Sequence, residues 1–244
     1  TSYTVLGADA APLEIGVRLS AGALEGLPDA PNNTSRCFDM DGNGRINESG
    51  ECLGDYQLTL PFADEVAGRE DIPFLFAMVN LEANGHPPLP WSVPHFDIHF
   101  YSITPEEVEA IAVGSCDFFI DCAVRERALQ PVPAAYVHAE FADVAATVGQ
   151  MGNHLIDTKT PELAEGGPPF THTWIYGAFE GRIIFHEVMA TTEFLTATED
   201  MCAEIKQPQA WERAGYYPTR YCFGREADGG VRIYMADFVM RPAG

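Results

Sequence analysis

The six cysteines of this chain fall into three local pairs, which restrict the possible folds more than any other feature of the sequence. The pairs are Cys37 with Cys52, Cys116 with Cys122, and Cys202 with Cys222. No pair has the C-x-x-C spacing of a zinc ribbon or a thioredoxin-type redox site, so three short disulfides fit better, although six cysteines permit 15 pairings. Because disulfides persist in oxidising compartments, we expect a secreted protein, extracellular or periplasmic.

Length and composition favour one domain with a substantial core. The chain has 244 residues, 46% of them hydrophobic, and no Ser/Gly-rich or Pro/Gln-rich linker divides it, so we expect a single domain over residues 1–244. No apolar run is long enough to span a bilayer. Acidic residues outnumber basic ones by 36 to 14, for a formal charge of −22. That charge argues against nucleic acid or anionic membranes as partners and favours cations, small molecules or copies of the chain, unless it serves only solubility.

The pattern of apolar residues predicts a mostly antiparallel β structure. Segments rich in aromatic and β-branched residues predict strands at Tyr56–Phe62, Phe74–Leu81, His95–Ile103, Thr171–Phe179, Arg182–Met189, Tyr217–Arg225 and Val231–Val239. The last four form two hairpins, with turns at 180–181 and 228–230.

Two helices are expected beside these strands. Thr104 caps the first, Pro105 occupies its first turn and Glu107 completes a capping box, and this helix should end near Gly114. The second should run over residues 192–205. The order of elements predicts the α+β class, with an antiparallel or barrel-like sheet and a few flanking helices.

Residues 37–52 match the start of a calcium-binding loop of the pattern D-x-[DN]-x-[DN]-G. Pattern positions 1, 3, 5, 6 and 7 are filled by Asp39, Asp41, Asn43, Gly44 and the carbonyl of Arg45. Calcium takes six to eight oxygen ligands, and alternate side chains on a tightly curled backbone supply them. The sequence therefore predicts a Ca²⁺ site here, the alternative being a polar surface turn that binds nothing.

The loop departs from an EF-hand at its end, where position 12 is Gly50. The closing ligand is then Glu51, or Glu48 with a different curl, and the flanks do not read as two long helices. A disulfide between Cys37 and Cys52 would close a loop of about 15 residues and contribute about 3 kcal/mol. A lone loop held in this way predicts a structural calcium ion rather than a switch.

A second group of candidate ligands lies on the segment 95–101, which alternates strictly between polar and apolar residues. The polar positions are His95, Asp97, His99 and Tyr101. Period two predicts a strand with one wholly polar face. On a regular strand His95 and His99 lie about 13 Å apart, so they cannot share an ion unless the strand is bulged or strongly coiled. Either could pair with Asp97 alone.

The hairpin 171–189 extends this group. A two-residue turn would place Trp174 opposite Glu187 and Tyr176 opposite Phe185, with His172 and Glu187 diagonal neighbours on one face about 7–8 Å apart. His186 would then point to the opposite face. Another histidine, His154, precedes Asp157 by three residues in a segment expected to be a loop.

These residues predict one divalent-metal site contributed by several segments. The candidate ligands are His95, His99, His154, His172 and Glu187. Imidazoles with one carboxylate suit zinc, iron, copper or manganese. Asp97 or Asp157 would orient a ligand or serve as a general base. The alternative is a set of hydrogen-bonded histidines that line an aromatic pocket.

Four short strings resemble a family of bacterial proteins of unknown function. They are PHFDIHFY (94–101), MGNHLID (151–157), FTHTWIYGAFEG (170–181) and IIFHEVM (183–189). The family's structurally known representative belongs to an envelope-stress regulon and forms a large homo-oligomeric ring. The resemblance covers residues 55–240 and implies a secreted or envelope-associated domain that forms homo-oligomers, but no activity or catalytic residues. Val188 stands where the family pattern has proline, and the calcium loop looks like an addition.

Two functions follow from these observations. The first is a secreted calcium-binding protein with a His/Glu divalent-metal site, acting as a metal-dependent hydrolase or lyase on a small molecule. The second is a non-catalytic binding or assembly protein that calcium stabilises outside the cell.

Overall fold

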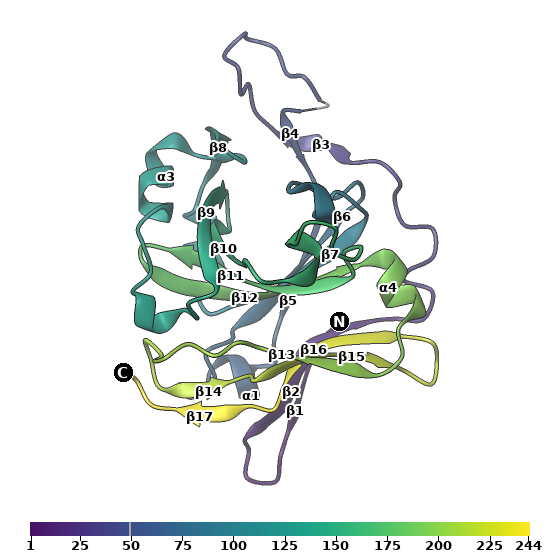
Figure 1. The fold of residues 1–244 in the computed structure, drawn as a ribbon, viewed down its shortest axis with the longest axis vertical. Coiled ribbons are helices and arrows are strands. Elements are labelled where there is room, and N and C mark those ends of the chain that lie inside the picture. Colours follow the sequence, from purple (N-terminus) through teal and green to yellow (C-terminus); the bar gives the residue numbers. More distant parts are fainter. Residues whose placement is uncertain (49) are drawn as a thin grey trace.

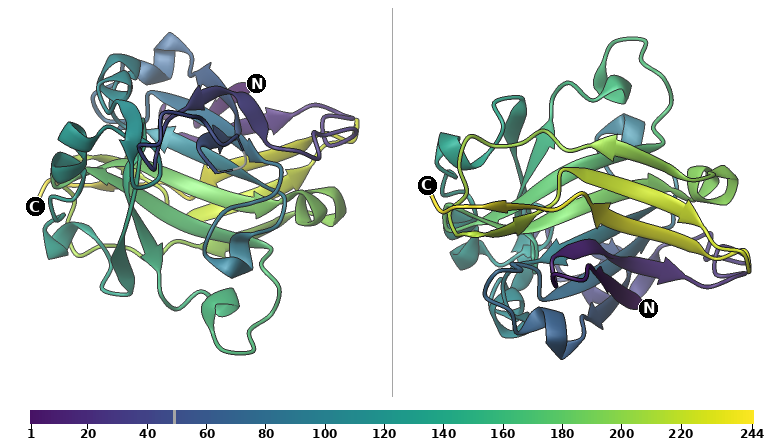
Figure 2. Two further views of the ribbon diagram at one scale, coloured as in Figure 1. Left: turned by 90° about the horizontal axis from the view of Figure 1, so that it is seen from above. Right: turned by 90° about the horizontal axis from the view of Figure 1, so that it is seen from below.

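Two antiparallel sheets stacked face to face form the body of the protein (Figure 1). The structure is a computed structural model that describes residues 1–48 and 50–244. For Thr34 and Ser35 it describes only the backbone. Short helices flank the sheets, so the predicted α+β class is confirmed. Seen from below, strands of the smaller sheet cross in front of the larger one (Figure 2).

The larger sheet has seven strands in the order β5-β6-β7-β12-β11-β10-β9, and all neighbours are antiparallel. Its strands are β5 (Tyr56–Pro61), β6 (Phe76–Glu82), β7 (His95–Tyr101), β9 (Phe141–Val148), β10 (Gly152–Asp157), β11 (His172–Phe179) and β12 (Arg182–Thr191). The sheet ends at the edge strands β5 and β9, so it is open rather than barrel-like. The expected loop around His154 is instead part of strand β10.

The smaller sheet joins both ends of the chain in the order β1-β2-β16-β15-β13. Its strands are β1 (Ser2–Leu6), β2 (Pro12–Leu19), β13 (Met201–Glu204), β15 (Arg220–Arg225) and β16 (Val231–Ala236). Two small ribbons pair β3 (Asn32–Cys37) with β4 (Cys52–Gly54) and β14 (Gly215–Tyr217) with β17 (Val239–Arg241). The remaining elements are β8 (Val113–Cys116), α1 (Asp64–Ala67), α2 (Pro105–Glu109), α3 (Cys122–Ala128), α4 (Thr192–Ala197) and the 3₁₀ turns η1 (Leu89–Trp91), η2 (Ala134–Tyr136) and η3 (Pro161–Leu163).

Both predicted helices begin where expected, but they end early. In α2 the Thr104 hydroxyl accepts a hydrogen bond from the Glu107 amide, and the Glu107 carboxylate accepts one from the Thr104 amide, which completes the capping box. The chain then enters β8 before it reaches the predicted end at Gly114. Helix α4 stops at Ala197 because the rest of the predicted helix is the strand β13, which pairs with β15.

The three predicted disulfides are present. Cys37–Cys52 joins β3 to β4, Cys116–Cys122 joins β8 to α3, and Cys202–Cys222 joins β13 to β15. Each bond therefore closes a local element pair rather than linking the two sheets. Among the described residues, no helix is long and apolar enough to cross a membrane.

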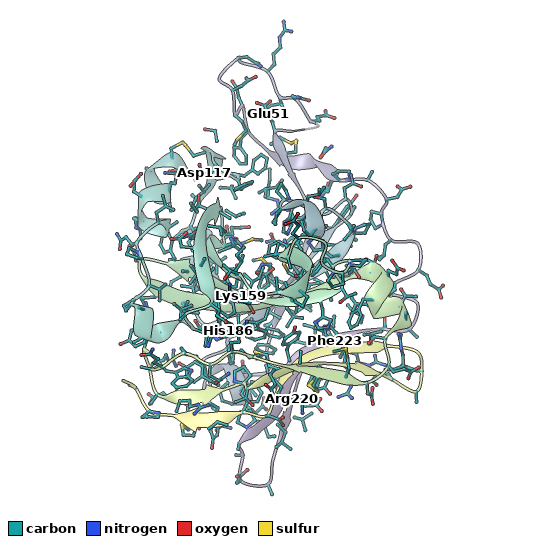
Figure 3. The ribbon with its side chains drawn as sticks, in the orientation of Figure 1. Glu51, Asp117, Lys159, His186, Arg220 and Phe223 are labelled. Atoms are coloured by element: carbon teal, nitrogen blue, oxygen red, sulfur yellow. A yellow bond between two sulfur atoms is a disulfide. The ribbon has the colours of Figure 1, made fainter. Side chains whose placement is uncertain are left out.

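The main core lies between the two sheets. The apolar residues of β7, Phe96, Ile98 and Phe100, pack in one buried cluster with residues of the smaller sheet such as Val17 and Phe223. Phe223 is labelled in Figure 3 between the sheets. Because side chains alternate along a strand, the polar residues of β7 must point to the other face of the larger sheet, away from the smaller one.

That outer face is covered at both ends by apolar residues. At one end Val108 of α2, Ile120 between β8 and α3, and Ala128 of α3 belong to a second buried cluster. At the other end Trp91 of η1 packs with Met189 of β12 in a third cluster. The polar residues of β7 therefore lie between two apolar covers.

Replacing Phe223 by alanine should destabilise the stacked sheets strongly. The ring is fully buried, so Phe223→Ala is expected to lower the free energy of unfolding by about 3–5 kcal/mol in chemical denaturation. The matched control is Phe118→Ala, since the Phe118 side chain is exposed, and it should change stability by no more than about 0.5 kcal/mol. Equal losses in both variants would contradict a core between the sheets.

Candidate metal centres

The polar row predicted on segment 95–101 exists and is wholly buried. Strand β7 lies between β6 and β12, and all seven of its residues are buried. Asp97 pairs with Asn80 and Met189, and His99 pairs with Met78 and Glu187, so these side chains share the outer face of the sheet. Buried charged groups of this kind require partners inside the protein.

The predicted register of the hairpin β11–β12 is wrong by one residue. Trp174 pairs with Val188 and Tyr176 with His186, because the register shifts between Gly177 and Ala178. A β-bulge adds one residue to a strand and turns every later side chain to the other face. Glu187 therefore lies on the outer face while His172 points between the sheets.

Both His172 and Asp157 are thus separated from Glu187. The His172 ring nitrogen Nδ1 lies 2.9 Å from the Tyr221 hydroxyl, and Asp157 forms an ion pair with Lys206 at 2.6 Å. Together they line a cavity of about 300 Å³ beside Trp174. The prediction that His186 points away from Glu187 is confirmed, since the His186 ring packs against Phe74 and the label in Figure 3 lies between the sheets.

The first candidate centre consists of His99, His154 and Glu187. Each offers one ligand atom, and these three atoms all lie within 4.8 Å of one another. His99 and Glu187 are adjacent on β7 and β12, with 3.7 Å between Nε2 and Oε2. His154 lies on β10, where it pairs with Gly177 of the adjacent strand β11, and its side chain extends toward His99 and Glu187.

Gly177 and Phe185 bring His154 close to the other two residues. A Cβ atom at Gly177 would lie 2.0 Å from the Phe185 ring, so only glycine lets this ring lie flat over β11. The ring packs edge-on against His99 at 4.8 Å and against His154 at 5.6 Å, measured between centroids. The aromatic ring therefore separates the two imidazoles from the apolar cover.

Hydrogen bonding leaves the ligand atoms of this centre free. His154 Nδ1 lies 2.8 Å from the Ala146 carbonyl, which can only accept, so Nδ1 carries the hydrogen and Nε2 keeps its lone pair. Glu187 Oε2 and His99 Nδ1 are buried without a hydrogen-bond partner. An acceptor buried in this way costs free energy unless a cation or donor reaches it.

Burial sets the charge state of the centre in the absence of a cation. It raises the pKa of Glu187 well above its usual range, and the negative charge of Asp97 adds to this effect. It also lowers the pKa of His99 to about 4 and the pKa of His154 below its ordinary value. The three side chains are therefore neutral near pH 7 while no cation is bound.

The other two predicted residues, His95 and Asp97, lie in a second group with His86. Their ligand atoms are likewise within 4.8 Å of one another, and His95 Nε2 lies 3.2 Å from Asp97 Oδ1. Of the predicted ligands, His95 therefore groups with His86 and Asp97 rather than with His99, His154 and Glu187, and the polar row of β7 divides between two groups. His86 was missed because it lies in the Pro-rich segment 85–90, where no periodic pattern points to a ligand.

The third group is the acidic loop between β3 and β4, which projects away from both sheets (Figure 1). Asp39, Asp41 and Glu51 present oxygen atoms within 4.8 Å of one another. Glu51 is buried and accepts hydrogen bonds from the amides of residues 40, 41 and 47, and the bond from Asn47 is the main cause of its lowered pKa. Of the two predicted closing ligands, Glu51 is therefore the one that turns inward, and Glu48 is exposed.

The remaining predicted loop ligands have other contacts. The Asn43 side-chain oxygen accepts from the Arg45 amide at 2.9 Å, and its nitrogen donates to Asp41 Oδ2 at 2.7 Å. The turn is closed by Asp39, which accepts from the amides of Asn43 and Gly44. Participation of Asn43 and of the Arg45 carbonyl as ligands stays a prediction, and Ser49 in this loop lies outside the described residues.

Comparison of the chain with protein-family models, with curated proteins and with solved structures finds no match. The geometry of these groups is therefore the basis for inferring a function.

His172 should make stability depend on pH. Burial lowers the pKa of the folded imidazole, while the unfolded chain titrates near the usual value of about 6.5. Below that pH the unfolded state binds a proton that folded His172 does not, so the free energy of unfolding must fall as the pH decreases. In urea titrations between pH 7 and 5, His172→Gln should lose less stability than the unmodified protein. Identical losses would show that His172 titrates alike in both states.

Proposed function

We propose that this protein is a secreted metalloprotein in which His99, His154 and Glu187 bind a divalent transition-metal ion for a reaction on a small molecule. The observation that carries the proposal is the buried convergence of two imidazoles on a carboxylate oxygen that has no hydrogen-bond partner. Three disulfides support an extracellular or periplasmic location.

A metal ion accounts for this geometry better than a hydrogen-bonded network does. In a network, donors and acceptors would be matched, yet Glu187 Oε2, the oxygen that faces His99 Nε2, has no hydrogen-bond partner. His154 Nδ1 donates to the Ala146 carbonyl, and metal-binding histidines commonly make a hydrogen bond of this kind. The bond fixes the ring and would direct Nε2 toward the ion. A cation would also allow Glu187 to ionise in a site where burial otherwise keeps it neutral.

The donor set selects the class of metal and of reaction. Two nitrogens and one oxygen suit zinc, iron, manganese or copper, and three protein ligands leave coordination positions for water or substrate. Such an ion, when bound, activates water or polarises a carbonyl, as hydrolases and lyases require. His154 is the half-buried member of the centre, so the substrate would approach from its side.

We propose in addition that the loop between β3 and β4 binds calcium through Asp39, Asp41 and Glu51. Its ligands are all oxygens, which calcium prefers, and the Cys37–Cys52 disulfide fixes the loop ends. This ion would be structural, because the loop stands apart from both sheets.

A second candidate function depends on this loop. The protein would be a non-catalytic, homo-oligomeric assembly or binding protein that calcium stabilises outside the cell. The acidic loop favours this alternative, because it projects from the body of the protein, away from both sheets. Sedimentation with and without calcium, together with metal analysis, distinguishes the two: transition metal in the purified protein supports the first.

Removal of His154 should weaken transition-metal binding. Loss of a residue that only hydrogen-bonds to a metal ligand weakens metal binding by about 10–100-fold. Because His154→Gln removes a ligand itself, we expect it to raise the Kd for Zn²⁺ by more than this. Isothermal titration after EDTA dialysis, with calcium present, measures this value. His172→Gln is the matched control, since it changes a histidine on the opposite face of the same sheet. Equal affinities in the two variants would refute the centre.

Calcium should raise the melting temperature through Glu51. At a calcium concentration of 100 times Kd, stabilisation should reach about 2.7 kcal/mol, and Glu51→Gln should abolish it. Glu48→Gln makes the same chemical change at an exposed residue of the loop and should leave the calcium effect intact. A calcium response that survives Glu51→Gln but not Glu48→Gln would reverse the assignment.

A further inference from the structure

We infer that His86, His95 and Asp97 form a second divalent-metal site on the same face of the larger sheet. It goes beyond the proposed function, because its ligands are distinct from those of the first centre and one of them comes from outside the sheet. His95 and Asp97 lie on β7, and His86 lies in the loop between β6 and η1.

The loop holds His86 in a defined position over β7. The His86 amide donates to the Trp91 carbonyl, and its own carbonyl accepts from the Ser92 hydroxyl, both at 3.3 Å. The preceding Gly85 has a φ of 67°, and a Cβ there would lie 2.2 Å from the Trp91 carbonyl oxygen, so glycine is required for this turn. The His86 ring then meets the His95 ring edge-on at 4.8 Å.

Backbone carbonyls determine which nitrogen of each ring is free. His95 Nδ1 lies 2.7 Å from the Val93 carbonyl and His86 Nδ1 lies 2.8 Å from the Pro87 carbonyl. A carbonyl can only accept, so both Nδ1 atoms carry hydrogen, and Nε2 is the nitrogen of each ring that is left for another partner. This is the same arrangement as at His154 in the first centre.

Both free nitrogens face one carboxylate. His95 Nε2 lies 3.2 Å from Asp97 Oδ1, and His86 Nε2 lies 3.7 Å from Asp97 Oδ2. Neither His95 Nε2 nor Asp97 Oδ1 makes a hydrogen bond, although His95 is 0% and Asp97 5% exposed. Two ring nitrogens that face a carboxylate in a buried site require either protons or a cation between them.

One metal ion meets this requirement more simply than protons do. Protonation of one ring would satisfy one of the two contacts with Asp97 and leave the other unmade, and protonation of both would place two imidazolium ions beside a single carboxylate, where like charges repel strongly. A divalent ion at the centre would bind all three donors at once. The set of two nitrogens and one oxygen suits zinc, iron, manganese or cobalt rather than calcium.

The site also has a route of entry. The His86 side chain is 36% exposed, whereas the other two ligands are buried, so an ion can arrive at the His86 edge from solvent. Asp97 and His99 lie two residues apart on β7, about 6.6 Å between Cα atoms. The two centres are therefore neighbours along one strand, each with its own two histidines and one carboxylate.

Cobalt titration tests this second site. EDTA-treated protein, with excess calcium to fill the acidic loop, would be titrated with Co²⁺ while d–d absorption and bound cobalt per chain are measured. We expect two equivalents in the unmodified protein and one each in His86→Ala and Glu187→Gln, with none in the double variant. Because His86 is partly exposed, His86→Ala should fold normally, and circular dichroism and the melting temperature verify this. His172→Gln should retain both equivalents.

The outcomes separate the two proposals. If His86→Ala and Asp97→Asn bind as much cobalt as the unmodified protein, the second site is refuted, and loss in Glu187→Gln still supports the first. If cobalt is lost in His86→Ala but not in Glu187→Gln, the second site stands and the proposed function fails. Unmodified protein that binds no cobalt overturns both.

Discussion

The complete burial of β7 on both faces is the constraint on which the rest of the structure depends. One face supplies Phe96, Ile98 and Phe100 to the core between the sheets, and the strand itself lies inside the larger sheet, between β6 and β12. The other face must then bury His95, Asp97 and His99 as well. Because burial of ionisable groups is costly without partners, the surrounding elements have to supply imidazoles, carboxylates or a cation. The candidate centres are a consequence of where the strand lies.

Features that depend on local sequence were predictable. Strict alternation over 95–101 identifies the polar face of β7, the residues around Thr104 identify the helix start, and the cysteine spacings identify three local disulfides. The acidic group in the loop at 37–52 could be recognised because its carboxylates follow one another closely along the chain, while calcium binding there stays a prediction. In each case the interacting residues are neighbours in sequence, so no long-range geometry is needed.

Features that depend on non-local geometry could not be predicted. The bulge in β11–β12 places His172 and Glu187 on opposite faces of the sheet, whereas a regular hairpin would place them on the same face. The local signal for the bulge is Gly177, and a glycine can also occur in a regular strand. His86 reaches Asp97 from a loop whose path is set by contacts with Trp91. The choice of Glu51 over Glu48 depends on backbone amides that converge only once the loop has curled.

The chain separates two kinds of ligand set by both chemistry and location. The loop between β3 and β4 offers oxygens only and stands apart from the sheets, as a hard and readily hydrated cation requires. Each group on the sheet face offers two imidazole nitrogens and one carboxylate in a buried setting, which favours borderline transition metals. Calcium in excess would therefore compete poorly for the sheet face, because two of the three donors there are nitrogens. The high negative charge of the chain attracts cations of either class, so donor type rather than electrostatic attraction would decide which ion each proposed site binds.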